Sequence, residues 1–183
     1  QAKNQHIGYK KIENKGIAAN TNAAAELASG EYLALADHDD ILAPHAMYTM
    51  GQAIRQLREA GEPDGFLYSD EALFTKKIEK PLVAHFKPDY APDYLLCCNY
   101  ICHLAVFRRE LFEQAGGERS VCDGSQDHDL FLRLIEQVGG AAHVPQVLYY
   151  WRVHEGSTSG GTDAKPYVAK AAKKALADHL ERT

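Results

Sequence analysis

Hydrophobic residues follow strand-like and helix-like patterns along this chain, and segments of the two kinds alternate. Short apolar runs predict strands over residues 6–12, 32–36, 66–68, 101–107 and 144–153. Helical spacing and composition predict helices over residues 17–28, 44–60, 109–115, 126–138 and 166–180. Strands that alternate with helices in this way indicate the α/β class.

Several of these segments carry further signals. The run at 32–36 is nearly unbroken, which fits a strand buried on both faces, as in a parallel sheet. Gly30 is expected to cap the C-terminus of the helix at 17–28, and Ser125 is expected to cap the N-terminus of the helix at 126–138. Residues 73–94 show no regular pattern, so we expect a loop or a hairpin there.

Length and charge narrow the class of protein. The 183 residues suit one domain over residues 1–183, with residues 165–183 as its C-terminal helix. The net charge is −5 and the basic residues are scattered, which disfavours a nucleic-acid-binding protein. No apolar run approaches the about 20 residues that span a bilayer. We therefore expect a cytoplasmic protein.

The cysteines are Cys97, Cys98, Cys102 and Cys122. None of them forms the C-x-x-C spacing of a zinc or redox site. Buried free thiols in a reducing compartment are the expectation.

The first candidate for chemistry is an acidic cluster at the end of the run at 32–36. Asp37, Asp39 and Asp40 lie where a strand gives way to a loop, and ligands of open α/β sheets bind at such strand ends. Carboxylates this close repel one another unless a cation or raised pKa values relieve the repulsion. Oxygen ligands favour Mg²⁺ or Mn²⁺. The alternative is a set of acids that favours the N-terminus of the next helix.

Two further segments carry candidate residues. Asp127, with Asp129 nearby, falls in the first turn of a helix and is a candidate general base, although simple helix capping explains it equally well. His154 leaves the strand at 144–153 and is a candidate metal ligand, with a structural or surface histidine as the alternative. Arg152 is a candidate phosphate ligand.

Taken in order, these segments resemble the family 2 glycosyltransferases, which have the GT-A fold. Residues 14–22 and 28–32 look like the approach to the metal motif of that family. Residues 37–40 resemble its Asp-x-Asp segment, and residues 124–127 resemble the segment that carries its catalytic base. Residues 149–154 resemble its C-terminal strand. The implied fold is a GT-A-like, Rossmann-like mixed sheet flanked by helices.

The resemblance implies a role for each matching residue. Asp39 would bind a divalent cation, Mn²⁺ or Mg²⁺, that bridges the diphosphate of a nucleotide sugar, and His154 would be a further metal ligand. Asp127 would deprotonate the acceptor hydroxyl, so that the sugar is transferred with inversion. Asp37, Arg152 and Asn22 would bind the donor, with Asp37 near the ribose or the metal site.

The resemblance gives three further acidic residues either two alternative roles or only a general position. Asp40 would either join the metal site or cap the next helix. Asp70 and Glu71 follow a strand and would line the acceptor side. The other histidines, including His38 and His128, receive no role.

The sequence departs from the family in one respect. Members begin with a strand, a helix and a second strand that hold the nucleotide base, and nothing before His6 supplies these elements. The fold is therefore expected to be truncated at its N-terminus, with an exposed sheet edge and hydrophobic face. Such a piece would bind nucleotide sugar weakly and have little or no activity, and homo-oligomers through the uncovered surface would be a consequence.

The expected function is transfer of a sugar from a nucleoside-diphosphate sugar to a glycan or a lipid-linked acceptor, in surface polysaccharide synthesis. The parent protein would then work in the cytoplasm or at the inner face of the membrane. One alternative is a metal-dependent nucleotidyl or phosphoryl transferase, although the sequence has no Walker-type motif. Another is a non-catalytic module that binds a carbohydrate or a partner protein.

Overall fold

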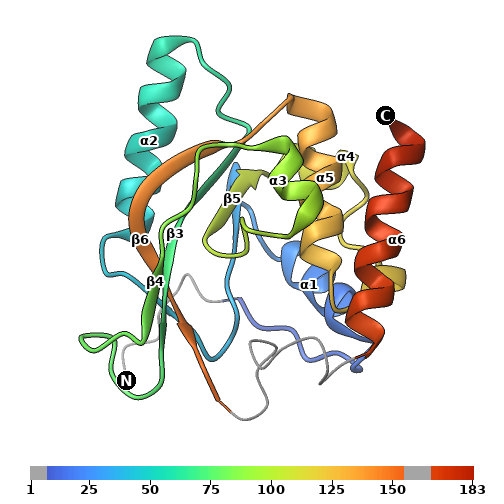
Figure 1. Cartoon of the computed structure of the whole chain (residues 1–183), viewed down its shortest axis with the longest axis horizontal. Coiled ribbons are helices and arrows are strands. Elements are labelled where there is room, and N and C mark those ends of the chain that lie inside the picture. The colour runs from blue at the N-terminus through green and yellow to red at the C-terminus, as the bar shows by residue number, and fades with distance from the viewer. Residues whose placement is uncertain (1–7, 155–165) are drawn as a thin grey trace.

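A mixed sheet forms the centre of the structure, with helices on both of its faces (Figure 1). The computed structural model describes residues 8–154 and 166–183, and within these ranges six strands form a single sheet. The strands are β1 (Tyr32–Leu35), β2 (Ile41–Leu42), β3 (Phe66–Phe74), β4 (Val83–His85), β5 (Ala105–Arg108) and β6 (Ala142–Arg152). Their order is β1-β5-β3-β6-β2, and β4 pairs with β3.

Six α-helices and a short 3₁₀ helix connect these strands within the described residues. They are α1 (Ile17–Ala25), α2 (Ala46–Ala60), α3 (Pro92–Cys97), α4 (Arg109–Gln114), η1 (Ser120–Cys122), α5 (Gln126–Val138) and α6 (Pro166–Arg182). None of the helices in this part of the chain is both long enough and apolar enough to cross a membrane. The predicted α/β class with a mixed sheet and flanking helices is confirmed.

Strand directions bring the predicted site residues to one edge of the sheet. β3 and β6 are parallel, and both β1 and β3 are antiparallel to β5, so β1 runs in the same direction as β3 and β6. The loop after β1 carries Asp37 to Asp40, and the chain after β6 carries His154. Two segments that lie far apart in the sequence therefore meet at the carboxyl ends of their strands.

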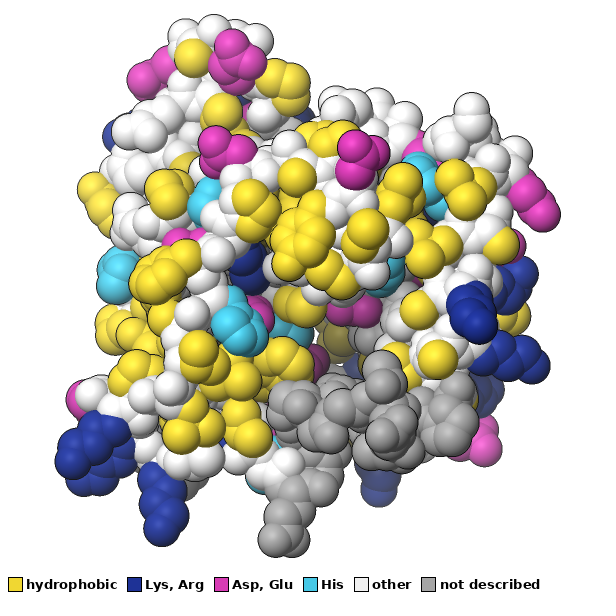
Figure 2. Space-filling view, in the orientation of Figure 1, with side chains coloured by type: hydrophobic (Ala, Val, Ile, Leu, Met, Phe, Trp, Pro, Cys, Tyr) yellow, Lys and Arg dark blue, Asp and Glu magenta, His cyan; other side chains and the backbone are white. Residues whose placement is uncertain are grey.

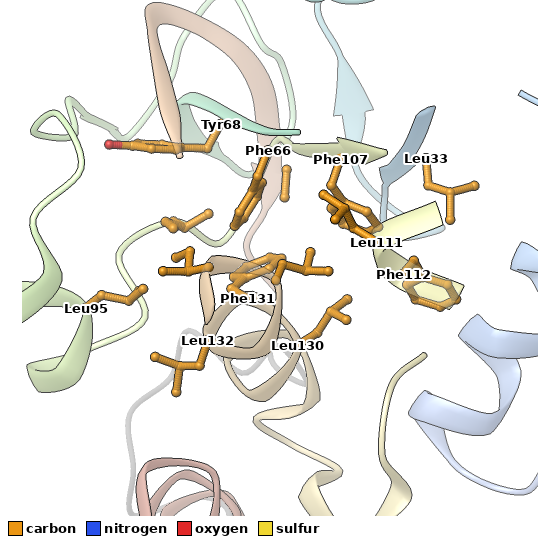
Figure 3. Packing of buried hydrophobic residues seen from close by; sticks show 14 of the residues in the cluster. Leu33, Phe66, Tyr68, Leu95, Phe107, Leu111, Phe112, Leu130, Phe131 and Leu132 are labelled. Carbon is orange, nitrogen blue, oxygen red and sulfur yellow. The ribbon is translucent and has the colours of Figure 1, made fainter. Parts of the chain in front are cut away.

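The side-chain alternation of β3 builds a hydrophobic core on each face of the sheet. Phe66 and Tyr68 point to the face covered by α5, where the ring of Phe66 lies 5.3 Å from that of Phe131 (Figure 3). Leu67 points to the opposite face and packs with Met50 of α2. This period of two is typical of a central strand that is covered on both sides.

The N-terminal half departs from the sequence prediction in three places. Residues 8–12 form no strand, and the remainder of the strand predicted at 6–12 lies outside the described residues. β1 is an edge strand of the described sheet that pairs antiparallel with β5, and only Leu33 in it is buried, so the expectation of a strand buried in a parallel sheet is wrong. Gly30 does not cap α1, whose C-cap is Glu26.

The middle of the chain is more ordered than its pattern predicted. β3 extends to Phe74 and forms the expected hairpin with β4, but α3 was missed because it is only one and a half turns long. Cys97 and Cys98 lie at the end of α3 and are exposed, whereas Cys122 is buried. All cysteines are free, but the expectation that they are all buried is wrong.

Hydrophobic side chains gather on the surface over β4 and α3 (Figure 2). Leu82, Val83 and Phe86 flank or form β4, Tyr94 lies on α3, and all four are exposed. This cluster lies over β4 and α3 and not at the β1 edge, so the predicted face left uncovered by an absent N-terminal segment stays a prediction.

Replacing Phe66 tests the contribution of the core between the sheet and α5 to stability. Phe66→Ala is expected to lower the free energy of unfolding by about 3–5 kcal/mol, because a fully buried ring is lost and the cavity collapses only in part. Val121→Ala, at an exposed apolar position, is the control and is expected to change it by less than about 0.5 kcal/mol. Urea denaturation followed by circular dichroism measures both, and similar effects for the two variants would contradict this account of the core.

Candidate active site

A cavity of about 960 Å³ opens at the carboxyl ends of β1 and β6, between the acidic loop, α1 and the N-terminus of α5. Its lining includes the predicted site residues Asp37, Asp39, Asp127, Arg152 and His154. The structure therefore gathers all but one of the predicted site residues around a single space. Its volume falls within the range of small-molecule sites.

Asp40 joins the acidic loop to β6. Its Oδ2 accepts a 2.6 Å hydrogen bond from the Tyr149 hydroxyl, and its Oδ1 accepts a 2.7 Å bond from the backbone N–H of Arg152. The Tyr149 hydroxyl in turn accepts a 2.9 Å bond from the backbone N–H of Asp37. Burial and the Asp40 carboxylate raise the pKa of Tyr149, so its hydroxyl remains a donor. The alternative role of Asp40 as a helix cap is wrong, since His45 occupies the N-cap of α2.

Asp39 and His154 meet although 115 residues separate them in the sequence. Asp39 Oδ2 lies 3.0 Å from His154 Nε2. Arg152 fixes this part of the loop, because its Nε donates a 2.7 Å hydrogen bond to the backbone carbonyl of Asp39 and its guanidinium lies 4.4 Å above the ring of Phe74. A carboxylate and an imidazole at this separation fit the ligand types of a divalent cation such as Mn²⁺.

Asp37 lies in a field of negative charge at the cavity wall. Burial raises its pKa, and the charges of Asp40, Asp127 and Asp39 raise it further, whereas His103 opposes them. Asp37, Asp40 and His103 hold ligand atoms within 4.8 Å of one another. Both oxygens of Asp40 already accept hydrogen bonds from the protein, so the Asp39–His154 pair is the better candidate for a metal.

His103 connects the acidic loop to buried charges beneath it. Its Nε2 lies 3.8 Å from Asp37 Oδ2, and its ring stacks on Tyr149 with centroids 4.6 Å apart. Its Nδ1 lies 3.6 Å from Glu71 Oε2, and that oxygen also accepts a 3.4 Å hydrogen bond from Lys87. Burial opposes a charge on His103, but the nearby Glu71 carboxylate raises its pKa overall. This gives the cavity a basic group that we did not predict.

Asp70 and Glu71 do not line the acceptor side, so that prediction is wrong. Both lie within β3 and are buried. Asp70 accepts a 2.9 Å hydrogen bond from the backbone N–H of Lys87 and lies 2.9 Å from His143. The sequence placed them after the strand because the apolar run ends at Tyr68, whereas β3 continues through them to Phe74.

Asp127 lies in the first turn of α5, as predicted. Its Oδ2 accepts a 2.8 Å hydrogen bond from the Asn99 side chain, and the residue lines the cavity. Ser125 is the N-cap residue but makes no capping hydrogen bond with its side chain. Asp129 is fully buried and pairs with Arg133 at 2.7 Å, so it supports the helix and does not face the cavity.

Asn22 is the one predicted site residue that does not line the cavity. Its amide exchanges two 2.8 Å hydrogen bonds with the backbone N–H and C=O of Glu118. Gly117 permits this close approach, because a Cβ there would lie 2.5 Å from the Asn22 side-chain oxygen. Asn22 therefore fixes α1 to the loop before α5.

A second contact between the same segments caps α1. The Asp123 carboxylate accepts a 3.0 Å hydrogen bond from the backbone N–H of Ala18, which satisfies one free donor at the start of the helix. Gly16 has a φ of 104°, and a Cβ at that position would lie 2.3 Å from the Asp123 carboxylate. The loop that leads to Asp127 is thus held by α1 at both Glu118 and Asp123.

Sequence reasoning missed four residues around the cavity, which are Asn99, His103, Glu118 and Tyr149. Asn99 and His103 lie in irregular segments, and no local pattern there indicates which way a side chain points. Tyr149 stood within the segment that resembles the C-terminal strand of the family but received no role. For Glu118, a charged residue after the Gly116-Gly117 pair was a signal that could have been followed.

Residues 1–116 match the protein family described as Glycosyl transferase family 2. Among curated proteins, the uncharacterized protein y4gI of Sinorhizobium fredii is 41% identical over 89% of this chain and 18% of its own length. The O-antigen biosynthesis protein RfbC of Myxococcus xanthus is 32% identical over 88% of this chain and 12% of its own length. The chain therefore spans less than a fifth of each of these relatives.

The fold is also found among solved structures. TarS of S. aureus, residues 1–349 in complex with UDP-GlcNAc, superposes with a TM-score of 0.59 over 91% of this chain and 52% of that one. The identity is 15%, so the likeness concerns the fold alone.

The contact between Tyr149 and Asp40 can be tested by removing one oxygen atom. Tyr149→Phe is expected to lower the free energy of unfolding by about 1–3 kcal/mol, because Asp40 and the Asp37 N–H each lose a hydrogen-bond partner. Tyr150→Phe removes the same atom from the next residue and is expected to have an effect below about 0.5 kcal/mol. Urea denaturation measures both variants, and equal effects would show that the hydroxyl of Tyr149 has no special role.

Proposed function

The chain belongs to glycosyl transferase family 2, and from this we propose that it is the catalytic part of an inverting glycosyltransferase. It would move a sugar from a nucleoside-diphosphate sugar to the hydroxyl of a glycan or a lipid-linked acceptor. The observation that carries this proposal is the common cavity that Asp39, His154 and Asp127 line. A metal-ligand pair and a carboxylate base on one cavity are what a displacement at a sugar carbon with a diphosphate leaving group requires.

The donor side of the proposed site is the Asp39–His154 pair. These residues would hold Mn²⁺ or Mg²⁺, which when bound supplies positive charge to the diphosphate as it leaves. Arg152 positions the pair through the backbone of Asp39, and Asp37 lies beside it for a contact with the ribose or the ion's water shell. His103 adds a basic group on the same wall. The UDP-GlcNAc complex of TarS supports a uridine nucleotide as the first donor to test.

The acceptor side of the proposed site is Asp127. The N-terminus of α5 favours negative charge, and Asn99 fixes the orientation of the carboxylate through Oδ2. Asp127 would take the proton of the acceptor hydroxyl while the hydroxyl oxygen bonds to the anomeric carbon and the bond from that carbon to the diphosphate breaks. One displacement from the opposite face inverts the configuration at the anomeric carbon.

The proposed role of the whole protein rests on its relatives. RfbC is named for O-antigen biosynthesis, which supports a role in surface polysaccharide synthesis. The whole protein would then work in the cytoplasm at the membrane, where a lipid-linked acceptor is available. Asn22 would contribute indirectly, by fixing the loop that carries Glu118 and leads to Asp127.

Calorimetric titration with UDP and dTDP tests the donor site. We expect binding that needs Mn²⁺ and weakens at least about tenfold in Asp39→Asn, because the variant loses a charged metal ligand. Glu110→Gln, which changes an exposed acid on α4, is the control and should bind as the wild type does. Binding that is indifferent to Mn²⁺, or equal in both variants, would refute the assignment of Asp39.

Substitution of Asp127 separates catalysis from binding. Asp127→Asn is expected to lower the turnover of a nucleotide sugar by about 10²–10⁴-fold, since a general base contributes that much. Its affinity for the Mn²⁺–nucleotide complex should stay within about threefold of the wild type. The assay measures the released nucleoside diphosphate. Release of pyrophosphate instead would indicate a nucleotidyl transferase, and nucleotide binding without any turnover would indicate a non-catalytic module.

A further inference from the structure

Glu118 places an unsatisfied carboxyl group at the wall of the cavity. The residue is only 5% exposed, and its Oε2 has no hydrogen-bond partner among the described residues. The side chain lines the same cavity as Asp127. Thr21 of α1 also lines the cavity and is close enough to the carboxyl group to lower its pKa.

The backbone around Glu118 holds this side chain in place. The Asn22 amide binds both the N–H and the C=O of Glu118, each at 2.8 Å. Gly117 before it has a φ of 72° and lies against Asn22. The backbone from which the Glu118 side chain projects is therefore fixed to α1.

A buried carboxyl group with an unmet hydrogen bond is costly to the folded protein. Burial raises the pKa of Glu118 to about 8, and the charges of Asp127 and Asp123 also raise it, whereas Thr21 and the charge of Arg133 lower it. The group is therefore mostly protonated at neutral pH, and it can both donate and accept a hydrogen bond. A sugar hydroxyl is the complementary group, since it also donates and accepts.

The proposed reaction fixes where the transferred sugar lies. Its anomeric carbon is joined to the diphosphate at the Asp39–His154 pair, and it is attacked by the hydroxyl that Asp127 deprotonates. The sugar ring consequently occupies the part of the cavity beside Asp127, where the charge of Asp127 is felt by Glu118. We propose, resting on the function above, that Glu118 binds a hydroxyl of the donor sugar and is a specificity-determining residue for it.

Calorimetry on three proteins tests this role. UDP or dTDP, whichever binds more tightly with Mn²⁺, is compared with its glucose and N-acetylglucosamine conjugates. In the wild type at least one conjugate is expected to bind more tightly than the bare nucleotide. In Glu118→Leu this gain should fall by about fivefold to tenfold, the value of one hydrogen bond, while the affinity for the bare nucleotide stays within about twofold. Glu113→Leu, at an exposed glutamate on α4, should leave both unchanged.

The number of protons exchanged on binding, measured in the wild type and in Glu118→Gln, distinguishes a contact with the sugar from a purely structural role. In two buffers of different ionisation enthalpy near pH 8, wild-type binding of the conjugate should exchange a different number of protons from binding of the bare nucleotide. This difference should vanish in Glu118→Gln, whose amide keeps its hydrogen bonds but does not titrate. Equal proton exchange for both ligands in the wild type, or a gain from the sugar that survives in Glu118→Leu, would overturn the proposal.

Unfolding of the ligand-free protein checks the premise separately. The folded pKa of Glu118 lies above the ordinary value of 4.5, so the folded state binds more protons between these values. Stability should therefore fall as the pH rises from about 4.5 to about 8 and then level off, and Glu118→Gln should remove that part of the decline. A decline unchanged in the variant would show that the carboxyl group is not held protonated and would overturn the proposal. If neither nucleotide binds with Mn²⁺, the proposed function itself fails, whereas nucleotide binding with no effect of Glu118 refutes only the role of Glu118.

Discussion

The candidate site depends on the hydrogen bonds that the Tyr149 hydroxyl and the Arg152 N–H make with Asp40. Together with the hydrogen bond from Arg152 Nε to the backbone carbonyl of Asp39, they fix the acidic loop after β1 to the end of β6. With them, Asp39 and His154 come within 3.0 Å of each other. The cost of burying Tyr149 is offset because its hydroxyl both donates and accepts a hydrogen bond. One side chain thus joins the two segments that supply the proposed metal ligands.

The negative charge around the cavity suits an anionic donor only if that donor binds together with a divalent cation. Two aspartates of one loop and Asp127 line a single space, and His103 is a basic group beside Asp37. Burial raises the pKa of Asp37, and the charges of Asp40, Asp127 and Asp39 raise it further. A bound divalent cation would lower the pKa of Asp37, whereas a diphosphate alone would not. We therefore expect the nucleotide and the metal to bind together.

A different part of the structure positions the base and Glu118. The helix α1 carries no proposed catalytic residue, yet its Asn22 and its N-terminus hold the loop before α5 at two points. Catalytic geometry is sensitive to small displacements, so such supporting contacts matter as much as the residues that touch substrate. In relatives of which this chain spans less than a fifth, the same arrangement would be one unit of a much longer polypeptide.

The sequence by itself determined the α/β class, most helices and strands, and the segments that carry Asp37, Asp39, Asp127 and His154. It could do so because helical and strand periods are local, and because polar residues that end an apolar run mark the edge of a sheet. It did not place Asp70 and Glu71, whose ion pairs with Lys87 and the nearby histidines allow them to be buried inside a long strand. Only the tertiary structure decided which oxygen of each carboxylate is already bonded, that Asn22 fixes a loop, and that Glu118 is buried without a full set of partners. These properties depend on contacts between residues up to 115 positions apart, and no local pattern encodes such a contact.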